Sequence, residues 1–539
     1  MKREKHIIIT LFSVFLIRII AIFLIYGLQI EPPFISGGPD SFFHWFSSEK
    51  YFIQLFKLTT SGPDPVLYLS GAREILASRV NTFNFFAPMN FYFIAAFLYL
   101  GKGYTIIPIV AMAIFGWLTV IGIYQLAKIL FDEKTAVIAA IFTGIYPNFI
   151  YFGVNLLPET LAVFFIVFSF LMLAKYFYTS KIYDLLLSGI LWGIASQTRG
   201  GLHYFSIFIA LAILIHDYRG KKTILWKPIA TYLIATYLTI VTIGIVVFPT
   251  HGEFALNSKS GIGSFVHGLN RITTSCGDYG DVIGNIFYDI NNCVFDIKDC
   301  GEKWPDGTQI FSKDIFELGT GQILLKSARF IAESPLLYIK NSLRKLSCFW
   351  SPNQLVIGHI KTGFQNVNNL IVGGVCLGIS LLYVFIICGG LWGMSLSRDP
   401  FRPIFISFII FYCVMIFLTV GNSKLRIPLM PFFIMYCSYF ITSIGGKNRS
   451  WRKIFFNKWV LIIIVIFICN SIYKYREITL LPAEITVRKI ELCNELGFYR
   501  TAFYLYNNLN PHYHFTAVQM ARAKAAQKNA LNKLQALEK

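Results

Sequence analysis

The chain has 539 residues, of which 55% are hydrophobic, 17% aromatic and 14% charged, and its mean hydropathy is +0.59. A soluble domain of this length cannot bury so much apolar side chain, so the composition excludes a soluble globular protein. The formal charge of +20 would suggest nucleic-acid binding in a soluble protein. Here many Lys and Arg residues lie between apolar runs, which indicates the positive-inside pattern of a membrane protein.

The first apolar run covers about residues 7–28 and follows a short basic segment. It is about 20 residues long and no small-residue cleavage site follows, so we expect a retained helix rather than a cleaved signal peptide. Arg18 lies inside this run. Because an ionisable side chain is costly at that depth, we expect Arg18 to face the bundle and pair with a carboxylate.

Apolar runs of similar length recur along the chain, and we predict an all-α polytopic membrane protein with about eleven transmembrane helices. Their approximate ranges are 7–28, 104–128, 135–154, 158–175, 183–198, 202–217, 229–248, 367–394, 403–420, 427–445 and 459–473. If residue 1 is cytoplasmic, the connections rich in Lys and Arg also face the cytoplasm. The C-terminus then lies outside.

This topology divides the chain into four predicted parts. They are a membrane catalytic module at 1–248, with an outer loop at about 29–103, an outer loop with amphipathic helices at 249–366, membrane helices at 367–473, and an outer helical tail at 474–539. We expect the interrupted apolar stretches at 42–56 and 84–100 to be interfacial or re-entrant helices. If 84–100 spans the membrane instead, later connections change sides until another span compensates.

Cysteine usage indicates no metal site. Six Cys residues lie in or near apolar spans, where they pack as small hydrophobic groups. Cys276, Cys293 and Cys300 share one polar outer loop, where two of them could pair in an oxidising compartment or all three could stay unpaired. The sequence also contains no Walker motif or dinucleotide-binding fingerprint, which argues against ATP-driven transport and Rossmann-type nucleotide-sugar chemistry.

The passage SGPDPVLYLSGAREILASRVNTFNFFAPMNFYFIAAFLYLGKGYT begins in the first outer loop. It resembles the first loop of the GT-C superfamily of polyprenyl-phosphate-sugar glycosyltransferases. The branch concerned, glycosyltransferase family 39, includes the protein O-mannosyltransferases and the aminoarabinose transferases. The likeness extends to YPNFIYFGVNLLPETLAVFF, QTRGG and NSKLRIPLMPF. The branch often has Lys before the Pro of its second motif, whereas this chain has Ala87, so a donor-phosphate contact from that Lys is not available here.

The resemblance implies an inverting transfer of a sugar from a polyprenyl-phosphate donor to an envelope lipid, glycan or protein, on the outer face of a bacterial cell membrane. An archaeal membrane would fit almost as well. Such a reaction must take a proton from the acceptor and stabilise negative charge on the leaving phosphate. A carboxylate and cations must therefore meet at one site. No cofactor is certain, although a divalent cation is possible, and we expect membrane lipids but no nucleic acid as partners.

Asp64 is our first candidate for the general base. It follows Gly62-Pro63 and precedes a predicted helix, and Tyr68 has the spacing that the resemblance assigns to substrate binding. An ordinary N-cap is the alternative for Asp64. Asp40 has the same Gly-Pro-Asp preface and competes with Asp64 for the role.

Glu159 follows Pro158 at the start of a predicted helix, where the resemblance implies a second acid that binds the acceptor or, in some branches, belongs to a metal site. The helix macrodipole also favours an acid there without any catalytic purpose. Arg199, Lys424 and Arg426 are candidates to bind the lipid phosphate, with snorkelling to headgroups as the alternative. Tyr146 could stack on a sugar or belong to an interfacial aromatic belt.

Two functions of other classes stay open. A lipid-linked-glycan flippase or transporter would place ionisable groups near the bilayer midplane and use broken, repeated spans. Here the candidate acids gather in outer loops. A polysaccharide polymerase or ligase would use a pyrophosphate-linked oligosaccharide, and an acid in the first loop is less expected there.

Overall fold

The computed structural model contains helices and irregular connections in the residues that it describes, in agreement with the predicted all-α class. The described residues are 2–26, 63–81, 86–222, 225–251, 265, 320–333, 335–352, 355–363, 369–444, 458–479, 482–495, 499–507, 509 and 515–537.

Within these ranges, five helices are long and apolar enough to cross a membrane, which supports an integral membrane protein. They are Ile106–Leu130, Pro158–Thr179, Trp226–Thr250, Leu370–Leu396 and Ser423–Ile444. Shorter apolar helices cover Thr10–Ile22, Met89–Leu100 and Arg402–Leu418. The number of about eleven spans stays a prediction.

The chain forms two compact units. The first consists of Met1–Gly261, Tyr383–Tyr412 and Ile427–Val465, and the second of Ile262–Leu382, Cys413–Arg426 and Ile466–Lys539. Up to residue 261 the helices of the first unit are α1 (Lys2–Tyr26), α3 (Pro63–Leu76), α4 (Met89–Leu100), α5 (Ile106–Leu130), α6 (Glu133–Ile145), α7 (Pro147–Phe152), α8 (Pro158–Thr179), α9 (Ile182–Thr198), the 3-10 helix η1 (Leu202–Phe205), α10 (Ser206–Lys221) and α11 (Trp226–His251).

The helices after residue 261 are distributed over both units. α20 (Met430–Ile444) belongs to the first unit, and α18 (Asn369–Leu396), α19 (Arg402–Leu418), the 3-10 helix η2 (Ser423–Leu429) and α22 (Lys458–Thr479) contribute residues to both. The second unit also contains α15 (Thr320–Glu333), α16 (Pro335–Phe349), α17 (Leu355–Gly363), α23 (Pro482–Glu495), α24 (Tyr499–Asn507) and α25 (Ala517–Leu537).

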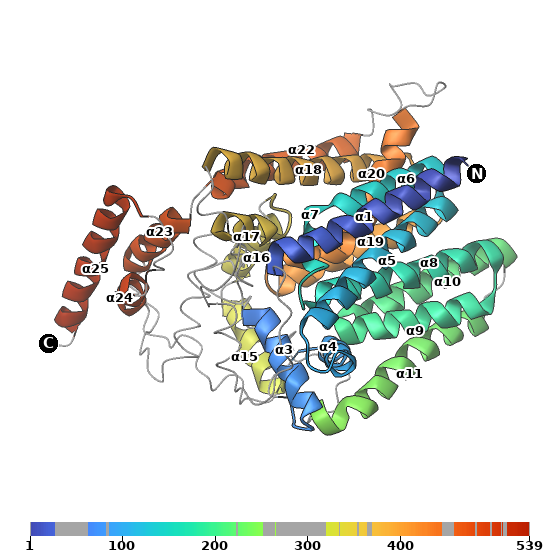
Figure 1. The fold of residues 1–539 in the computed structure, drawn as a ribbon, viewed down its shortest axis with the longest axis horizontal. Coiled ribbons are helices and arrows are strands. Elements are labelled where there is room, and N and C mark those ends of the chain that lie inside the picture. The colour runs from blue at the N-terminus through green and yellow to red at the C-terminus, as the bar shows by residue number, and fades with distance from the viewer. Residues whose placement is uncertain are drawn as a thin grey trace. The chain divides into compact units, whose positions relative to one another are not determined.

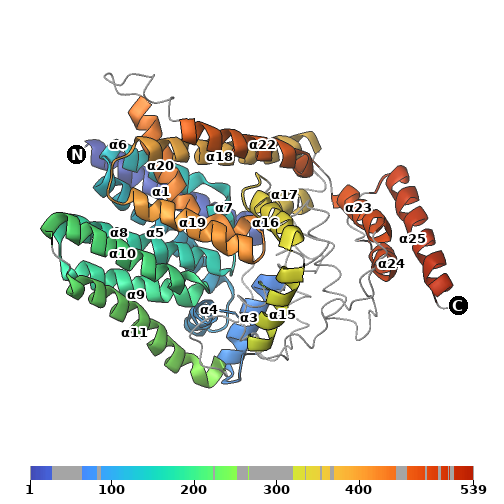
Figure 2. The same cartoon turned by 180° about the vertical axis from the view of Figure 1, so that it is seen from behind.

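The first unit is a bundle in which α8 packs between α5 and α9, and α9 packs between α8 and α11 (Figures 1 and 2). Two glycines one turn apart allow the last of these contacts. A Cβ on Gly189 would lie 2.6 Å from Tyr232 O, and one on Gly193 would lie 2.8 Å from Thr236 O. Small residues at this spacing bring the backbones of membrane helices close together.

Aromatic side chains fill the interior of this unit around Trp192, which is 0% exposed. Its ring stacks on Phe170 at 5.4 Å and contacts Phe205 at 5.7 Å, while its Nε1–H donates to Leu202 O at 3.1 Å. The indole is therefore buried with its polar atom satisfied. This contact ties the end of α9 to the start of η1.

The expected continuous span at 135–154 is interrupted in the structure. α6 ends at Ile145, Tyr146 has an extended backbone, and α7 begins at Pro147. The physical reason is proline, which lacks an amide donor and disfavours helical backbone in the residue before it. The sequence at 146–158 therefore forms a short helix and an irregular connection rather than part of a span.

The stretch at 84–100 contributes a 12-residue helix, α4, which packs against α3 and α5. A helix of 12 residues is about 18 Å long, too short to cross the hydrocarbon core. Its length agrees with the expected non-spanning helix. The other such helix, expected at 42–56, lies outside the described residues.

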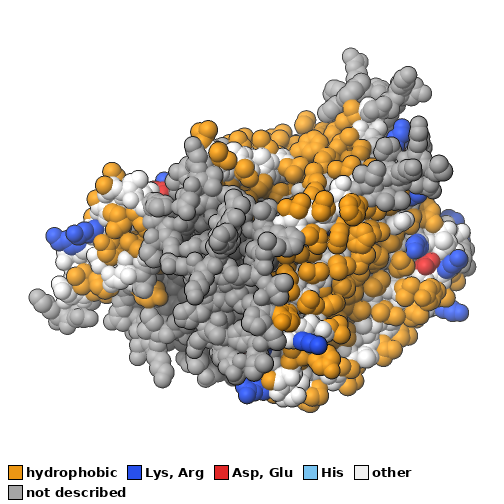
Figure 3. All heavy atoms as spheres, viewed as in Figure 1, with side chains coloured by type: hydrophobic (Ala, Val, Ile, Leu, Met, Phe, Trp, Pro, Cys, Tyr) orange, Lys and Arg blue, Asp and Glu red, His pale blue; other side chains and the backbone are white. Residues whose placement is uncertain are grey.

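The first unit has an apolar outer face, seen in orange in Figure 3, with Lys and Arg side chains around its margins. Lys128 lies in the last turn of α5, and the turns between α8 and α9 and between α10 and α11 contain Lys181 and Lys222, respectively. The start of α1 and the latter two turns lie at the same end of the bundle in Figures 1 and 2. This is the distribution that the predicted topology requires.

In the second unit, helices α23, α24 and α25 pack against one another, and α25 confirms the helix-forming tail expected from the sequence. Their shared core consists of Val487, Ile490, Cys493, Ala502, Ala523 and Ala530. Cys348, at the end of α16, is disulfide-bonded, so it is not the simple packing residue that its apolar neighbourhood suggested. The possible pairing of Cys276, Cys293 and Cys300 lies outside the described residues.

Candidate active site

The candidate site lies at the connection between α7 and α8, where the backbone leaves helical geometry inside the first unit. Residues 151–157 are all buried. Asn155 Nδ2 donates to Tyr151 O at 2.7 Å, and Asn90 Nδ2 from α4 donates to Leu156 O at 3.4 Å. Irregular backbone is tolerated in a membrane protein where protein surrounds it or where it lines a cavity.

Glu159 is the second residue of α8, after Pro158 at the first position, and its side chain is 4% exposed. Arg199 is the C-cap residue of α9, and its side chain is 12% exposed. Their charged groups approach to 3.5 Å. The N-terminus of α8 favours the anion and the C-terminus of α9 favours the cation, so both helix dipoles support the pair.

Glu159 uses only part of its hydrogen-bonding capacity. Its Oε2 atom is buried and has no hydrogen-bond partner among the described residues. The charges of Glu159 and Arg199 both act on the hydroxyl of Tyr412 in α19, which is also buried. A carboxylate and a guanidinium therefore meet from α8 and α9.

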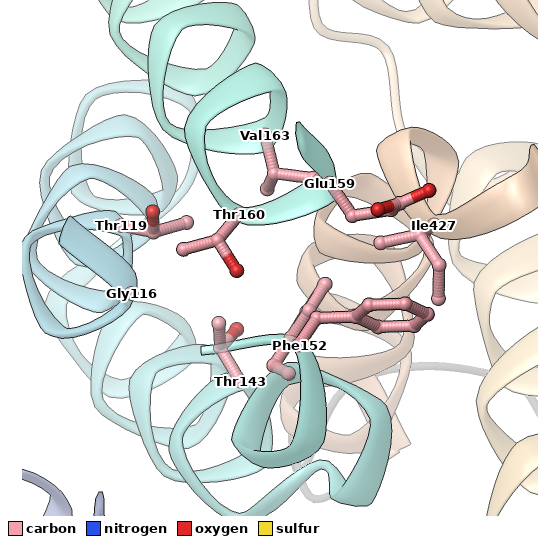
Figure 4. Close-up of a pocket in the computed structure, with 9 residues that line it drawn as sticks. Gly116, Thr119, Thr143, Phe152, Glu159, Thr160, Val163 and Ile427 are labelled. Atoms are coloured by element: carbon pink, nitrogen blue, oxygen red, sulfur yellow. The ribbon is translucent and has the colours of Figure 1, made fainter. Parts of the chain in front are cut away.

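A cavity lies next to Glu159 (Figure 4). Its volume is about 10 Å³, enough for one water molecule. It is lined by Gly116, Thr119, Thr143, Phe149, Phe152, Glu159, Thr160, Val163 and Ile427. In Figure 4 the carboxylate of Glu159 lies on the side of Ile427, and Thr143 and Thr160 point towards one another at the other side. The cavity therefore has a charged side and a hydroxyl-lined side.

Tyr146 is 0% exposed, and its hydroxyl accepts a hydrogen bond from Asn148 Nδ2 at 3.1 Å. Its ring contacts Phe149 at 5.2 Å. Tyr146 is not one of the residues that line the cavity, whereas Phe149 is. The geometry places Tyr146 behind the cavity wall.

The first-loop candidates are described only in part. Asp64 is the second residue of α3, but its side chain lies outside the described residues, and Asp40 lies outside them entirely. Tyr68 is 6% exposed, and its ring contacts Phe91 at 4.8 Å and Phe86 at 5.3 Å. Tyr68 thus joins α3 to α4.

Lys424 and Arg426 both lie in η2. The backbone N–H of Lys424 donates to Asn422 Oδ1 at 2.9 Å, and Arg426 is 0% exposed and donates from Nη1 to Phe349 O. The burial of Arg426 argues against the headgroup-snorkelling alternative for this residue. The next residue, Ile427, lines the cavity beside Glu159.

Sequence reasoning missed the hydroxyl-lined side of the cavity. Thr119, Thr143 and Thr160 come from three different helices, and each looks unremarkable within its own apolar segment. The only signal was the occurrence of small and hydroxyl residues at helical spacing, which many membrane helices share. Among the described residues, no group of three or more His, Cys, Asp or Glu side chains is placed to bind a metal ion.

Residues 86–247 match the family described as dolichyl-phosphate-mannose-protein mannosyltransferase. This segment is less than a third of the chain, and it contains both Glu159 and Arg199. The match confirms the predicted resemblance to the GT-C superfamily and supports the prediction of a glycosyltransferase.

Solved structures with a similar arrangement include the oligosaccharyltransferase of Archaeoglobus fulgidus in its apo form, with 13% identity and a TM-score of 0.43. Another is the same archaeal enzyme, AglB, in complex with an inhibitory peptide and a dolichol-phosphate, with 12% identity and a TM-score of 0.41. Each similarity covers 96% of this chain and 64% of the archaeal chain, so this chain spans less than two thirds of their length. No curated protein matches the chain.

Proposed function

We propose, on the premise of this resemblance to the GT-C superfamily, that the chain is a glycosyltransferase that moves a sugar from a polyprenyl-phosphate donor to an acceptor hydroxyl or amine. The observation that carries the proposal is the buried Glu159–Arg199 ion pair beside a cavity, within the segment that matches the mannosyltransferase family. Charged groups are costly in a membrane bundle and usually serve a function there.

The proposed reaction is a single displacement. The acceptor oxygen or nitrogen attacks the anomeric carbon, and its proton passes to a carboxylate. The bond from the anomeric carbon to the phosphate oxygen breaks, and the polyprenyl phosphate leaves with the electron pair. One displacement inverts the anomeric configuration. The protein must therefore supply a base on one side of the sugar and positive charge near the departing phosphate.

We assign the base to Asp64, with Asp40 as the competing candidate. Asp64 stands in the first turn of α3, where the helix dipole favours the ionised carboxylate. Glu159 is assigned to acceptor binding, because its free Oε2 atom can accept a hydrogen bond from an incoming hydroxyl or amine.

The candidates for the lipid phosphate are Arg199 in the first unit and Lys424 and Arg426 in the second, since guanidinium and ammonium groups are the usual protein ligands of phosphate. Tyr68 and Tyr146 are buried, so we assign them to support of the α3–α4 pair and of the cavity wall rather than to stacking on a sugar. A divalent cation stays compatible with this proposal and is not required by it.

We further propose that the reaction takes place on the non-cytoplasmic face of a bacterial inner membrane, with about eleven spans and an outer C-terminal tail. The connections rich in Lys and Arg at one end of the first unit support this orientation. The acceptor is then a lipid, glycan or protein of the cell envelope.

The test uses the full-length protein in proteoliposomes that contain undecaprenyl-phosphate-linked sugars, beginning with mannose. We expect the wild-type protein to consume the donor and release undecaprenyl phosphate. Asp64→Asn should abolish turnover while the thermal unfolding midpoint stays unchanged, because an amide cannot take the proton. Asp184→Asn is the matched control, since Asp184 lies in the first turn of α9 and accepts a hydrogen bond from Thr179 instead.

Two results would count against these assignments in different ways. Full turnover by Asp64→Asn removes Asp64 as the base and transfers the role to Asp40, which Asp40→Asn then tests. If the wild-type protein turns over no lipid-phosphate-linked sugar and binds no undecaprenyl phosphate in native mass spectrometry, the transferase proposal itself is wrong.

A further inference from the structure

We propose that the hydroxyl-lined side of the cavity binds a monatomic anion, chloride in the cell, as the counter-ion of Arg18. Arg18 is not part of the Glu159–Arg199 ion pair that lies beside the same cavity. It does not depend on the transferase reaction.

Arg18 lies on the interior face of α1. Val14, Arg18 and Ile22 follow one another at intervals of four residues and are 3%, 0% and 3% exposed. Residues at this spacing share one face of a helix. The opposite side chains, such as Phe12 at 64% and Leu16 at 47% exposed, are available to lipid. The guanidinium therefore points into the bundle.

The bundle does not neutralise this charge. Arg18 Nη1 donates only to the carbonyl oxygens of Val14 at 3.3 Å and Gly144 at 3.4 Å. Its Nε and Nη2 atoms have no hydrogen-bond partner in the described part of the chain, and no ion pair found there includes Arg18. The expected pairing of Arg18 with a bundle carboxylate is therefore not found. Since arginine stays protonated in proteins, a buried unpaired guanidinium calls for an anion.

Glycines bring this guanidinium next to the cavity. A Cβ on Gly116, which lines the cavity, would lie 3.3 Å from Arg18 Nε and 3.7 Å from Thr160 Cγ2. A Cβ on Gly153 would lie 3.8 Å from the same Nε atom. Arg18 thus packs against the backbone of α5 and α7–α8 at the hydroxyl-lined side.

The cavity supplies a second unpaired donor there. Thr143 Oγ1 is buried without a hydrogen-bond partner among the described residues. Thr119, which lines the same cavity, already donates its hydroxyl proton to Phe115 O at 2.9 Å. Thr143 points into the space facing Thr160 in Figure 4. Arg18 and Thr143 therefore offer N–H and O–H donors that no acceptor among the described residues uses.

Charge and size select the occupant. The unpaired groups of Arg18 and Thr143 are donors, and the carboxylate on the cavity wall, Glu159, has its charge matched by Arg199 at 3.5 Å although its Oε2 atom accepts no hydrogen bond from the described residues. A water molecule could accept from both donors but would leave the arginine charge uncompensated in a medium of low dielectric constant. The cavity has room for about one water-sized particle, which favours a monatomic ion over a polyatomic one.

The test is the thermal unfolding midpoint of the detergent-solubilised full-length protein in chloride, bromide and gluconate at equal ionic strength. Ligand binding to the folded state raises its stability, so we expect saturating chloride or bromide to raise the midpoint by about 2 °C relative to gluconate, which is too large for the cavity. Arg18→Gln and Thr143→Val should each lose at least half of this difference. Thr119→Val is the matched control and should keep it, because its hydroxyl is already bonded within α5.

The outcomes are distinct. Equal midpoints of the wild-type protein in the three salts would overturn the proposal, as would a halide effect that persists in both Arg18→Gln and Thr143→Val. If Arg18→Gln does not fold, the halide effect on the unfolding midpoint of Thr143→Val, compared with that of Thr119→Val, is sufficient to test the proposal. In crystals grown with bromide, we expect an anomalous difference peak between Arg18 and Thr143. Water density without an anomalous signal would refute the anion.

Discussion

The carboxylate of Glu159 and the guanidinium of Arg199 form an ion pair that is almost closed to solvent. A buried pair of this kind adds little net stability, because desolvation offsets the attraction, but removal of one partner leaves an uncompensated charge. Both residues were candidates from sequence alone. Their pairing, across 40 residues of chain, followed only from the way α8 packs on α9.

Glu159→Gln preserves the shape of the side chain and removes its charge. We expect the thermal midpoint to fall by about 5 °C, because Arg199 becomes a buried unpaired cation worth roughly 3 kcal/mol of destabilisation. Arg199→Gln should cost a similar amount. The double variant should be more stable than the sum of the two single effects predicts, which a double-mutant cycle measures. Additive effects would show that the two charges do not interact.

Two glycines of α18 show that the surrounding contacts, rather than helix propensity, determine how a substitution changes stability. On α18, a Cβ at Gly393 would overlap the backbone carbonyl of Tyr436 in α20. On the same helix, Gly374 has nothing within 4 Å of the added atom. Both glycines lie in an apolar segment, and the sequence does not distinguish them.

Gly393→Ala should therefore destabilise the protein by about 1–3 kcal/mol, because a backbone carbonyl cannot move aside as the end of a side chain can. Gly374→Ala should leave stability unchanged or raise it slightly, since alanine favours a helix and meets no neighbour. Thermal midpoints of the two variants compare the sites directly. Equal midpoints would mean that α18 and α20 do not pack at Gly393.

The C-terminal helices are held together by charges as well as by their apolar core. Arg522 of α25 donates to Glu484 at 3.0 Å and to Glu491 at 2.6 Å on α23. Burial alone would raise the pKa of Glu484, but hydrogen bonds from Arg488, Gln519 and Arg522 outweigh it and hold the pKa below its ordinary value of 4.5. The folded state therefore prefers the ionised carboxylate.

Because this pKa is lowered on folding, Glu484 contributes stability above pH 4.5 and loses it as the pH falls through the folded-state value. We expect hydrogen exchange in α23 and α25, corrected for intrinsic rates, to accelerate below pH 4.5 in the full-length protein. Arg522→Ala should produce the same loss at neutral pH, by about 1 kcal/mol. Lys524→Ala is the control, since Lys524 is exposed on α25 and is in none of the ion pairs found with Glu484 or Glu491 among the described residues, and it should change protection by less than about 0.5 kcal/mol.

On the scale of the whole molecule, the apolar face of the first unit and the Lys-bearing turns at one end define an axis across the membrane. An odd number of spans then places the two termini on opposite sides. The predicted count of about eleven has this parity, and so would nine or thirteen. Orientation is therefore testable separately from the count.

A C-terminal alkaline phosphatase fusion, expressed in a bacterial host, should be active, because that enzyme folds in an oxidising exterior. A C-terminal green fluorescent protein fusion should remain dark for the converse reason. The Lys-bearing turns supply the physical cause, since positively charged short loops stay in the cytoplasm. If the green fluorescent protein fusion is fluorescent and the phosphatase fusion is inactive, the C-terminus lies in the cytoplasm. The predicted topology and the proposed face of the reaction are then wrong.

The sequence by itself determined the membrane class, the approximate helix positions and the identity of Glu159 and Arg199 as candidates. These features depend on local quantities: the length of apolar runs, the break made by Pro158, and the placement of charge between spans. The break at Pro147, within the span expected at 135–154, was missed because a proline can be tolerated inside a membrane helix.

The tertiary structure alone decided which groups meet. The ion pair of Glu159 with Arg199, the cavity that Gly116, Thr143 and Thr160 line, and the unpaired guanidinium of Arg18 all depend on how each helix is rotated about its axis and how closely glycines let it approach its neighbours. Hydrophobic periodicity is weak in a helix that is apolar on every side, so the chain carries little local signal for that rotation. Packing between helices supplies it instead.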